Sequence, residues 1–271
     1  MDPLYIVCIF TGIIHFTETA AATMRLAGVR TRQIATSLSF VNATLLVSRM
    51  SNMIQAPLLG GMVDTAILKD MASILANQFR LVILAAFIGN ALAAVLVPFF
   101  VFVFTNGIRK FEELGSLPKT IAFALRPTSI VYGIKKFKLP TPGSFKGLSL
   151  AGMPKGFLIM NLFMVSIYTI GVLASLYAGA LVPAYRVTAT MLSGIVNGIA
   201  TILLTLLVDP TSAWITDQAA RGKRPESQVR AMIFYIVLGR VVGALVISQL
   251  IFLPASNYIR GVTLLLQGFF Q

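Results

Sequence analysis

The sequence predicts an all-α, polytopic membrane protein with six transmembrane helices in a 3+3 inverted-topology repeat. Three observations predict it: long apolar stretches, an alternation of basic and weakly charged loops, and a likeness between the two halves. Hydrophobic residues make up 57% of the chain and charged residues 11%, which excludes an ordinary soluble domain. Each stretch has the roughly 20 residues that a membrane-spanning helix needs, and helices satisfy their own backbone groups in lipid. The stretches are Pro3–Met24, Ile34–Leu59, Leu81–Thr105, Gly156–Val182, Val187–Val208 and Ala231–Leu253.

The first apolar stretch reads as a retained helix, because Met1-Asp2 before it lacks the basic residue of a signal peptide and the run is long. His15 and Glu18 lie on one face of this helix, one turn apart. The pair is suited to relaying protons or to balancing Arg49 of the next helix, and both roles stay open. One histidine and one cysteine exclude a multi-histidine metal site and an intrachain disulfide, so no metal and no cofactor are expected.

The second stretch carries a polar face. Ser39, Asn42, Arg49 and Asn52 spread over about 140° of a helix that turns 100° per residue. Arg49 lies roughly 22 Å from the start of the helix at 1.5 Å per residue. A charge at this depth is costly, so it should face a cavity or a partner. An anion ligand and a structural ion pair are the two interpretations.

The third stretch leads into a basic linker, residues 108–155, which is rich in proline and glycine. It is expected to lie in the cytoplasm. An amphipathic helix on anionic headgroups and a plain topology signal are both compatible with it.

The last three stretches combine small and polar residues. Gly171, Ser175 and Gly179 repeat at i+4, and Asn197 lies on a similar line of polar residues in the fifth stretch. Arg240 lies near mid-membrane inside a GxxxG spacing that lets helix backbones touch. Helix packing explains most of these residues, while Asn197 and Arg240 are also candidates to line a cavity.

The basic residues predict the topology. The loops after the first, third and fifth stretches are rich in Lys and Arg, and the other loops are poor in them. By the positive-inside rule the rich loops face the cytoplasm and both termini face outward. This distribution also explains the formal net charge of +13 without nucleic-acid binding.

The two halves resemble each other, which predicts the division into a first repeat (1–107), the basic linker (108–155) and a second repeat (156–271). Asp64 falls opposite Asp217, Ala27-Gly28 opposite Ala178-Gly179, and Asn90 opposite Arg240. The charge argument gives the repeats opposite orientations, as in transporters with a central substrate site. The ungapped matches are Arg32, Ala35, Thr36, Leu38 and Ser39 against Arg186, Ala189, Thr190, Leu192 and Ser193, and Arg80, Ile83, Gly89 and Ala94 against Arg230, Ile233, Gly239 and Ala244.

Enzyme signatures are absent from the sequence. No P-loop, GxSxG, HExxH or kinase motif occurs, so we expect neither an ATPase nor another enzyme. Asp64, Asp209 and Asp217 lack the spacing of a metal site and are expected near helix ends.

The run RLAGVRTRQIATSLSFVNATLLVSRMSNMIQAPLLGGMVD resembles the bacterial Amj family, the alternate lipid II flippases. The resemblance covers Ile14–Asp64 closely and continues through the six-helix plan. It implies peptidoglycan synthesis and cell-wall biogenesis: lipid II, an undecaprenyl-pyrophosphate-linked muropeptide, would move from the inner to the outer leaflet of the bacterial cytoplasmic membrane. The residues carried over are His15, Glu18, Arg25, Arg30, Arg32, Arg49, Asn52, Gln55 and Asp64.

The residues themselves fit transport of a lipid-linked pyrophosphate by alternating access through a cationic central cavity. Arginine suits bidentate binding of phosphate. The alternative is a proton-coupled transporter of a small anionic solute. A scaffold has little reason to keep charged residues at mid-depth, and a membrane enzyme would require a ligand cluster that the sequence lacks. Lipid II and membrane lipids are the expected partners, and a homodimer is left open. The expected cavity residues are Arg49, Arg240, Asn52, Asn42, Gln55 and Asn197, with Arg25, Arg30 and Arg32 at the cytoplasmic mouth and His15 and Glu18 as a proton or ion pair.

Overall fold

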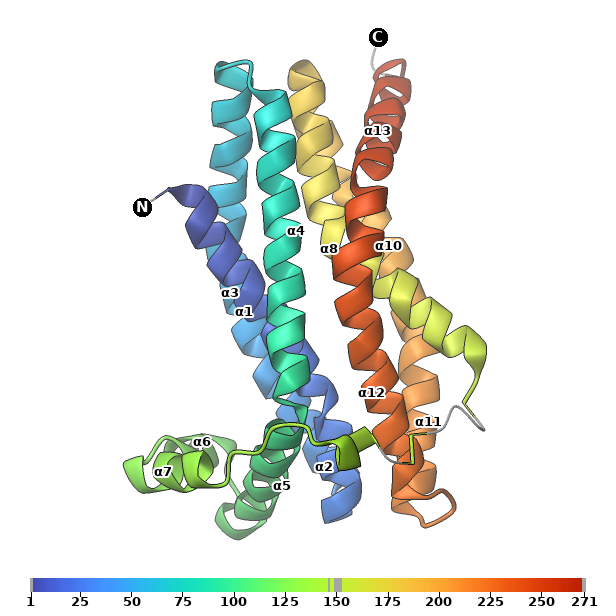
Figure 1. Cartoon of the computed structure of the whole chain (residues 1–271). Helices are drawn as coiled ribbons and strands as arrows, with labels where there is room; N and C mark the ends of the chain where they lie inside the picture. The colour runs from blue at the N-terminus through green and yellow to red at the C-terminus, as the bar shows by residue number, and fades with distance from the viewer. Residues whose placement is uncertain (1, 146, 149–152, 270–271) are drawn as a thin grey trace.

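The computed structural model describes residues 2–145, 147–148 and 153–269, and in these residues it is built of helices and their connections (Figure 1). The all-α prediction is confirmed. The helices of the first part of the chain are α1 (Pro3–Ala22), α2 (Met24–Thr31), α3 (Ile34–Leu68), α4 (Ala72–Val95), α5 (Val97–Leu114), α6 (Leu117–Ala124), α7 (Pro127–Lys135) and the short η1 (Pro142–Phe145).

The second part forms a similar set of long rods, interrupted by short irregular segments. Two of these segments, η3 and η4, are π-helical turns that continue their helices without a break. The elements are α8 (Lys155–Leu181), η2 (Pro183–Tyr185), α9 (Arg186–Met191), α10 (Ser193–Leu203), η3 (Leu204–Val208), α11 (Asp209–Ala220), α12 (Glu226–Val242), η4 (Gly243–Ile247) and α13 (Ser248–Gln267).

The rods run alternately up and down the bundle (Figure 1). α1 runs toward the lower end, α3 returns, and α4 runs down again. α8 runs upward, the α9–α11 rod runs down, and the α12–α13 rod returns to the upper end. The basic connections around α2, α5–α7 and α11–α12 therefore gather at the lower end. The two chain ends lie in the upper half.

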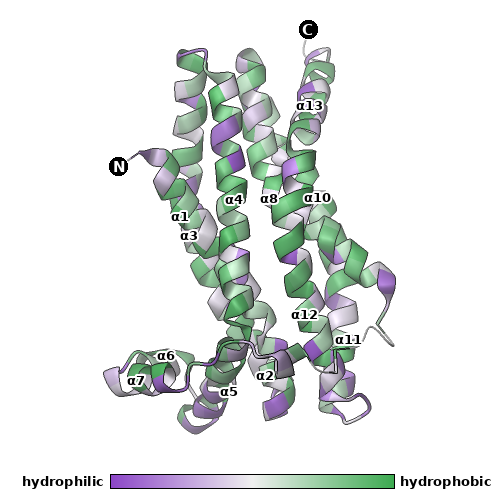
Figure 2. Cartoon of the chain, in the orientation of Figure 1, coloured by the Kyte–Doolittle hydropathy of each residue, from purple (hydrophilic) through white to green (hydrophobic). Residues whose placement is uncertain are grey.

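Among the described residues, five helices are long and apolar enough to cross a membrane. They contain or overlap the first, third, fourth, fifth and sixth predicted spans. The second, Ile34–Leu59, lies within α3, which has the required length but carries Arg49 and several amides and is not among the five. Figure 2 shows the apolar colouring that dominates the rods, with polar colouring concentrated at the lower end. The five are Pro3–Thr31, Ala72–Val95, Lys155–Leu181, Pro183–Ala220 and Glu226–Gln267.

The predicted bounds of the third span, Leu81–Thr105, are wrong. The helix begins at Ala72 and ends at Val95, and α5 starts after Leu96 with Pro98 at its beginning. Proline is tolerated in the first turn of a helix, where its missing N–H is not needed, so it favours a new start there. The Phe-rich run after Leu96 packs its rings against other aromatic residues, as in the Phe16–Phe100 and Phe40–Phe111 contacts, instead of extending the span.

The core has two large apolar clusters. In one, Phe79 and Phe252 contact each other edge to face with Leu59 and Ile170 nearby, and it joins α1, α3, α4, α8 and α13. The other centres on the start of α8 with α11 and α12. Both clusters contain residues of 1–107 and of 156–271. A set of polar contacts accompanies them within the bundle, and it includes Glu18 and Arg240 but not Arg49.

Candidate functional site

The site is organised around an ion pair between α1 and α12. Glu18 of α1 and Arg240 of α12 approach to 3.3 Å between Oε2 and Nη1. Their side chains are 25% and 17% exposed, so the pair is largely withdrawn from the surface. The other carboxylate oxygen, Oε1, accepts a hydrogen bond of 3.1 Å from Ser48 Oγ of α3. Glu18 therefore connects α1 with α3 and with α12.

Asn90 of α4 extends this network. Its Nδ2 donates to the backbone carbonyl of Arg240 at 3.3 Å, and its Oδ1 accepts from Thr19 Oγ1 at 2.6 Å. Asn90 and Thr19 are fully buried. A buried amide that uses both of its groups fixes the relative position of its neighbours, because leaving either group unpaired is costly. We name the set Glu18, Ser48, Thr19, Asn90 and Arg240 the central polar cluster.

Two buried nitrogen atoms in or near the central polar cluster are left without a hydrogen bond. Arg240 Nε and His15 Nδ1 have no hydrogen-bond partner among the described residues. His15 lies one turn before Glu18 on α1 and is 9% exposed. A guanidinium that uses Nη1 toward Glu18 still offers its Nε–H to a second acceptor, so Arg240 can hold an anion beside the carboxylate. The predicted alternative that Glu18 balances Arg49 is wrong, because Arg240 is its ion-pair partner.

Arg49 lies on a different side of α3 from Ser48. At 100° per residue, the buried residues Ser48, Gln55 and Leu59 form the face of α3 that packs on α1, and Arg49 lies about 100° from Ser48. Arg49 and Asn42 are exposed. Within the described part of the chain, Arg49 has no ion pair or hydrogen bond from its side chain. It is thus available on an outer face of the bundle.

The other predicted amides divide between these faces. Asn52 is exposed on α3, near the side that carries Arg49. Gln55 is buried, and its Oε1 accepts from Thr11 Oγ1 of α1 at 3.0 Å, so it works in helix packing. Asn197 of α10 lies against Gly171 of α8, where an added Cβ would be 2.0 Å from Asn197 Oδ1. The predicted cavity residues are therefore distributed over several faces instead of lining one chamber.

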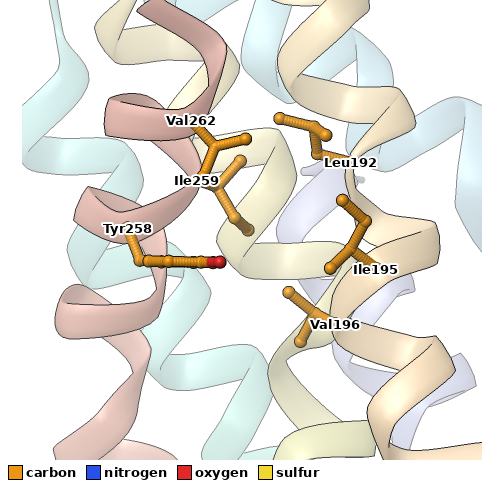
Figure 3. Close-up of a pocket in the computed structure, with 6 residues that line it drawn as sticks. All are labelled: Leu192, Ile195, Val196, Tyr258, Ile259 and Val262. Carbon is orange, nitrogen blue, oxygen red and sulfur yellow. The ribbon is translucent and has the colours of Figure 1, made fainter. Parts of the chain in front are cut away.

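A small pocket lies between α10 and α13 (Figure 3). Its lining is apolar apart from the hydroxyl of Tyr258, and it includes none of the predicted arginines. It therefore offers nothing that would hold a pyrophosphate. Its lining residues are Leu192, Ile195, Val196, Tyr258, Ile259 and Val262.

Two of the arginines predicted at the cytoplasmic mouth are already paired. Arg25 Nη2 lies 2.8 Å from Asp209 Oδ1 of α11, and Arg30 Nη2 lies 2.7 Å from Glu226 Oε1 of α12. Arg30 Nε also donates to the same oxygen at 3.0 Å. The remaining one, Arg32, ends α2 in a left-handed conformation with φ of 58° and is exposed. The pairs join α2 to α11 and α12.

An ion pair also joins distant parts of the chain at the upper end of the bundle. Asp64 of α3 and Arg186 of α9 approach to 2.9 Å. In the described part of the chain, every ion pair between residues distant in sequence joins residues 1–107 to residues 156–271. The remaining pairs, Lys110–Glu113 and Arg221–Asp217, lie within one helical turn. The described residues contain no cluster of His, Cys, Asp or Glu that could hold a metal ion.

Several of these partners were not among the predicted site residues. Ser48 and Thr19 are ordinary helix residues in sequence, Asp209 was expected only near a helix end, and Glu226 was not singled out. The predicted repeat sets Asn90 opposite Arg240, and in the structure Asn90 Nδ2 donates to the carbonyl of Arg240.

Comparison with known proteins gives the family. A family model described as "Amj: Alternate to MurJ" matches residues 10–263. A curated protein of Bacillus subtilis (strain 168) named "Lipid II flippase Amj" is 38% identical over 261 residues, which cover 96% of each chain. No solved structure matches. The resemblance noted in the Arg25–Asp64 run is confirmed, and the chain belongs to the Amj family.

Proposed function

We propose that this protein is a lipid II flippase, which moves the undecaprenyl-pyrophosphate-linked peptidoglycan precursor from the inner to the outer leaflet of the bacterial cytoplasmic membrane. The observation that carries the proposal is the 38% identity to a protein named a lipid II flippase over nearly the whole of both chains. The absence of an ATPase motif from the sequence is compatible with passive or gradient-coupled transport. The non-enzyme assignment follows from the same family name.

The proposal includes α3 as a sixth span and a 3+3 inverted repeat, with the linker 108–155 between the halves. Two glycines that the repeat alignment pairs both make a close contact, and this supports the repeat. An added Cβ on Gly89 of α4 would lie 2.3 Å from the carbonyl of Gly12 on α1. On the matching Gly239 of α12, it would lie 2.5 Å from Asn161 of α8. In each half, the third helix thus presses a glycine against the first.

The ion pairs between the halves supply the gates that alternating access requires. The Asp64–Arg186 pair would close the outer end, and Arg25–Asp209 and Arg30–Glu226 would close the cytoplasmic end. Glu18–Arg240 would hold the middle. Exposed ion pairs contribute only about 0–1 kcal/mol each, so they can break and re-form as the halves rock.

Two cationic elements would handle the pyrophosphate. Arg240 has a buried Nε–H free within the described residues and lies beside Glu18, so an incoming anion can compete with the carboxylate for the guanidinium. Arg49 with Asn42 and Asn52 forms an exposed polar track on α3. The headgroup would follow this track while the lipid tail stays in the bilayer. Arg25, Arg30 and Arg32 would receive it at the cytoplasmic end once their pairs open.

The orientation belongs to the proposal. The basic lower end would face the cytoplasm and both termini would lie outside, by the positive-inside rule. Membrane lipids surround the bundle under this proposal, and a homodimer stays a prediction. His15 would serve with Glu18 as the proton-handling pair if transport is coupled to the proton gradient.

The test is export in cells depleted of their major lipid II flippase. Cells that express this protein should keep surface-exposed lipid II, and cells that carry an empty vector should lose it. A variant with Arg240→Gln, matched for membrane expression, separates transport by this site from an indirect effect. Loss of surface lipid II despite normal expression of the unmodified protein would reject the proposal.

A further inference from the structure

The helical pair α6–α7 differs from the rest of the molecule in its direction. It projects sideways from the lower end of the bundle, across the long rods (Figure 1). α6 has 8 residues and α7 has 9, which gives lengths of about 12–14 Å at 1.5 Å per residue. A helix must be about twice as long to cross the roughly 30 Å hydrocarbon core. The pair can lie along a membrane surface but cannot span one.

The apolar side chains of this pair have little cover from the protein. No residue of α7 is buried. Leu125 and Ile134 are each 67% exposed, and Val131 is 50% exposed. Aromatic contacts join α5 to α7 through Phe102–Tyr132 and to the residues just after α7 through Phe99–Phe137. Large apolar side chains that are this exposed need an apolar surface outside the protein to remove them from water.

The charges beside these residues all have one sign. The segment from Leu114 to Lys155 contains no acidic residue. Ile134 is followed directly by a basic cluster, and the basic side chains of α6–α7 and the residues after it are exposed; they are Lys119, Arg126, Lys135, Lys136 and Lys138. Apolar side chains with flanking cations are typical of helices that lie in the headgroup region of a bilayer.

We propose that α6–α7 and the basic residues through Lys138 form a docking surface for the anionic phospholipid headgroups of the leaflet next to the lower end of the bundle. Ile134, Leu125 and Val131 enter the boundary between headgroups and acyl chains. The lysines and Arg126 contact the phosphates. Charge complementarity selects this occupant, since a phospholipid surface offers apolar depth and negative charge together.

Lipid II is itself an anionic lipid, so capture of substrate is the competing explanation. Substrate capture predicts a different dependence on the lipid composition of the membrane. A docking surface responds to the bulk fraction of anionic phospholipid, whereas a capture site responds to small amounts of lipid II. The two are separated by varying each lipid alone.

The experiment uses the full-length protein with Cys8→Ser and a single new cysteine, Ile134→Cys, labelled with an environment-sensitive fluorophore. The protein is reconstituted in phosphatidylcholine vesicles with or without about one-third phosphatidylglycerol, and quenching by lipids brominated in the acyl chain is measured. The matched control is Lys223→Cys, an exposed position in the turn between α11 and α12 at the same end. We expect quenching at position 134 to rise about twofold or more with phosphatidylglycerol and to stay low at position 223.

The charge requirement is tested by Lys135→Gln, Lys136→Gln and Lys138→Gln together, in the labelled protein. This variant should lose the response to phosphatidylglycerol, and high salt should weaken the response of the unmodified segment. Equal quenching at positions 134 and 223 in phosphatidylglycerol vesicles would overturn the proposal. So would a response to about 1% lipid II without phosphatidylglycerol. Neither result bears on whether the protein exports lipid II.

Discussion

The Glu18–Arg240 pair gives the sharpest prediction, because replacing one partner leaves a withdrawn charge without its counter-ion. At 3.3 Å, two unit charges attract by about 5 kcal/mol at an effective dielectric constant of 20. Residual exposure of 17–25% and local relaxation reduce the net effect. We expect Arg240→Gln to lower the free energy of unfolding by about 2–3 kcal/mol, which is less than the roughly 3–5 kcal/mol lost when a fully buried pair is broken.

The double variant tests whether the loss belongs to the pair. Glu18→Gln should cost about 1–2 kcal/mol, since glutamine can still accept from Ser48 Oγ. Glu18→Gln with Arg240→Gln removes both charges and should be more stable than the sum of the single losses by about 1–3 kcal/mol. Thermal unfolding of the purified protein in detergent measures this, and the Arg240→Gln midpoint should fall by about 4–10 °C.

Arg49→Gln is the matched control. It removes an arginine from the next position to Ser48, but one that is exposed and, in the described part of the chain, unpaired. Its midpoint should stay within about 1 °C of the unmodified protein, as expected for a surface substitution. Additive losses in the Glu18/Arg240 cycle, or an Arg49→Gln variant as unstable as Arg240→Gln, would refute the assignment of the ion pair.

Three other predictions concern transport and orientation. Arg49→Ala should abolish lipid II export with stability unchanged and Arg49→Lys should be intermediate, because a point charge replaces a bidentate donor; full export by Arg49→Ala would remove that residue from the path. In a Cys8→Ser background, a disulfide between Asp64→Cys and Arg186→Cys should stop export until reductant is added, whereas unchanged export by the oxidised protein would exclude this pair as a gate. A cysteine at Lys69 should react with an impermeant thiol reagent in intact cells and one at Lys223 should be protected; the reverse pattern would invert the proposed topology.

The apolar pattern predicted the helices well but not where they end. Most spans were recognised because helical rods in lipid must be apolar over a fixed length. α3 was harder, because its polar residues lower its hydropathy while it continues to Leu68. The third span was displaced because the Phe-rich run after Leu96 is as apolar as a span, and hydropathy alone does not distinguish a crossing helix from α5.

The partners of the charges were the least predictable part. Glu18 and Arg240 are 222 positions apart, and on sequence grounds Arg49 was an equally reasonable partner for Glu18. One residue decides between them: Ser48 faces α1, so its neighbour Arg49 is turned away by 100°. The polar face of α3 was correctly grouped, but whether it pointed inward or outward depended on how the whole bundle packs.

Close packing and polar contacts make different contributions to holding the bundle together. Apolar surfaces in lipid gain little by meeting each other, so helices are held there by close packing and by polar contacts. Within residues 1–107, helices pack closely, as where Gly89 lies against Gly12. Ion pairs join residues 1–107 to residues 156–271 at both ends and in the middle, and the exposed pairs at the ends are individually weak. In the proposed transport cycle, breaking one end pair would leave the packing of each half intact, while the two apolar clusters that both halves share would still hold the halves together.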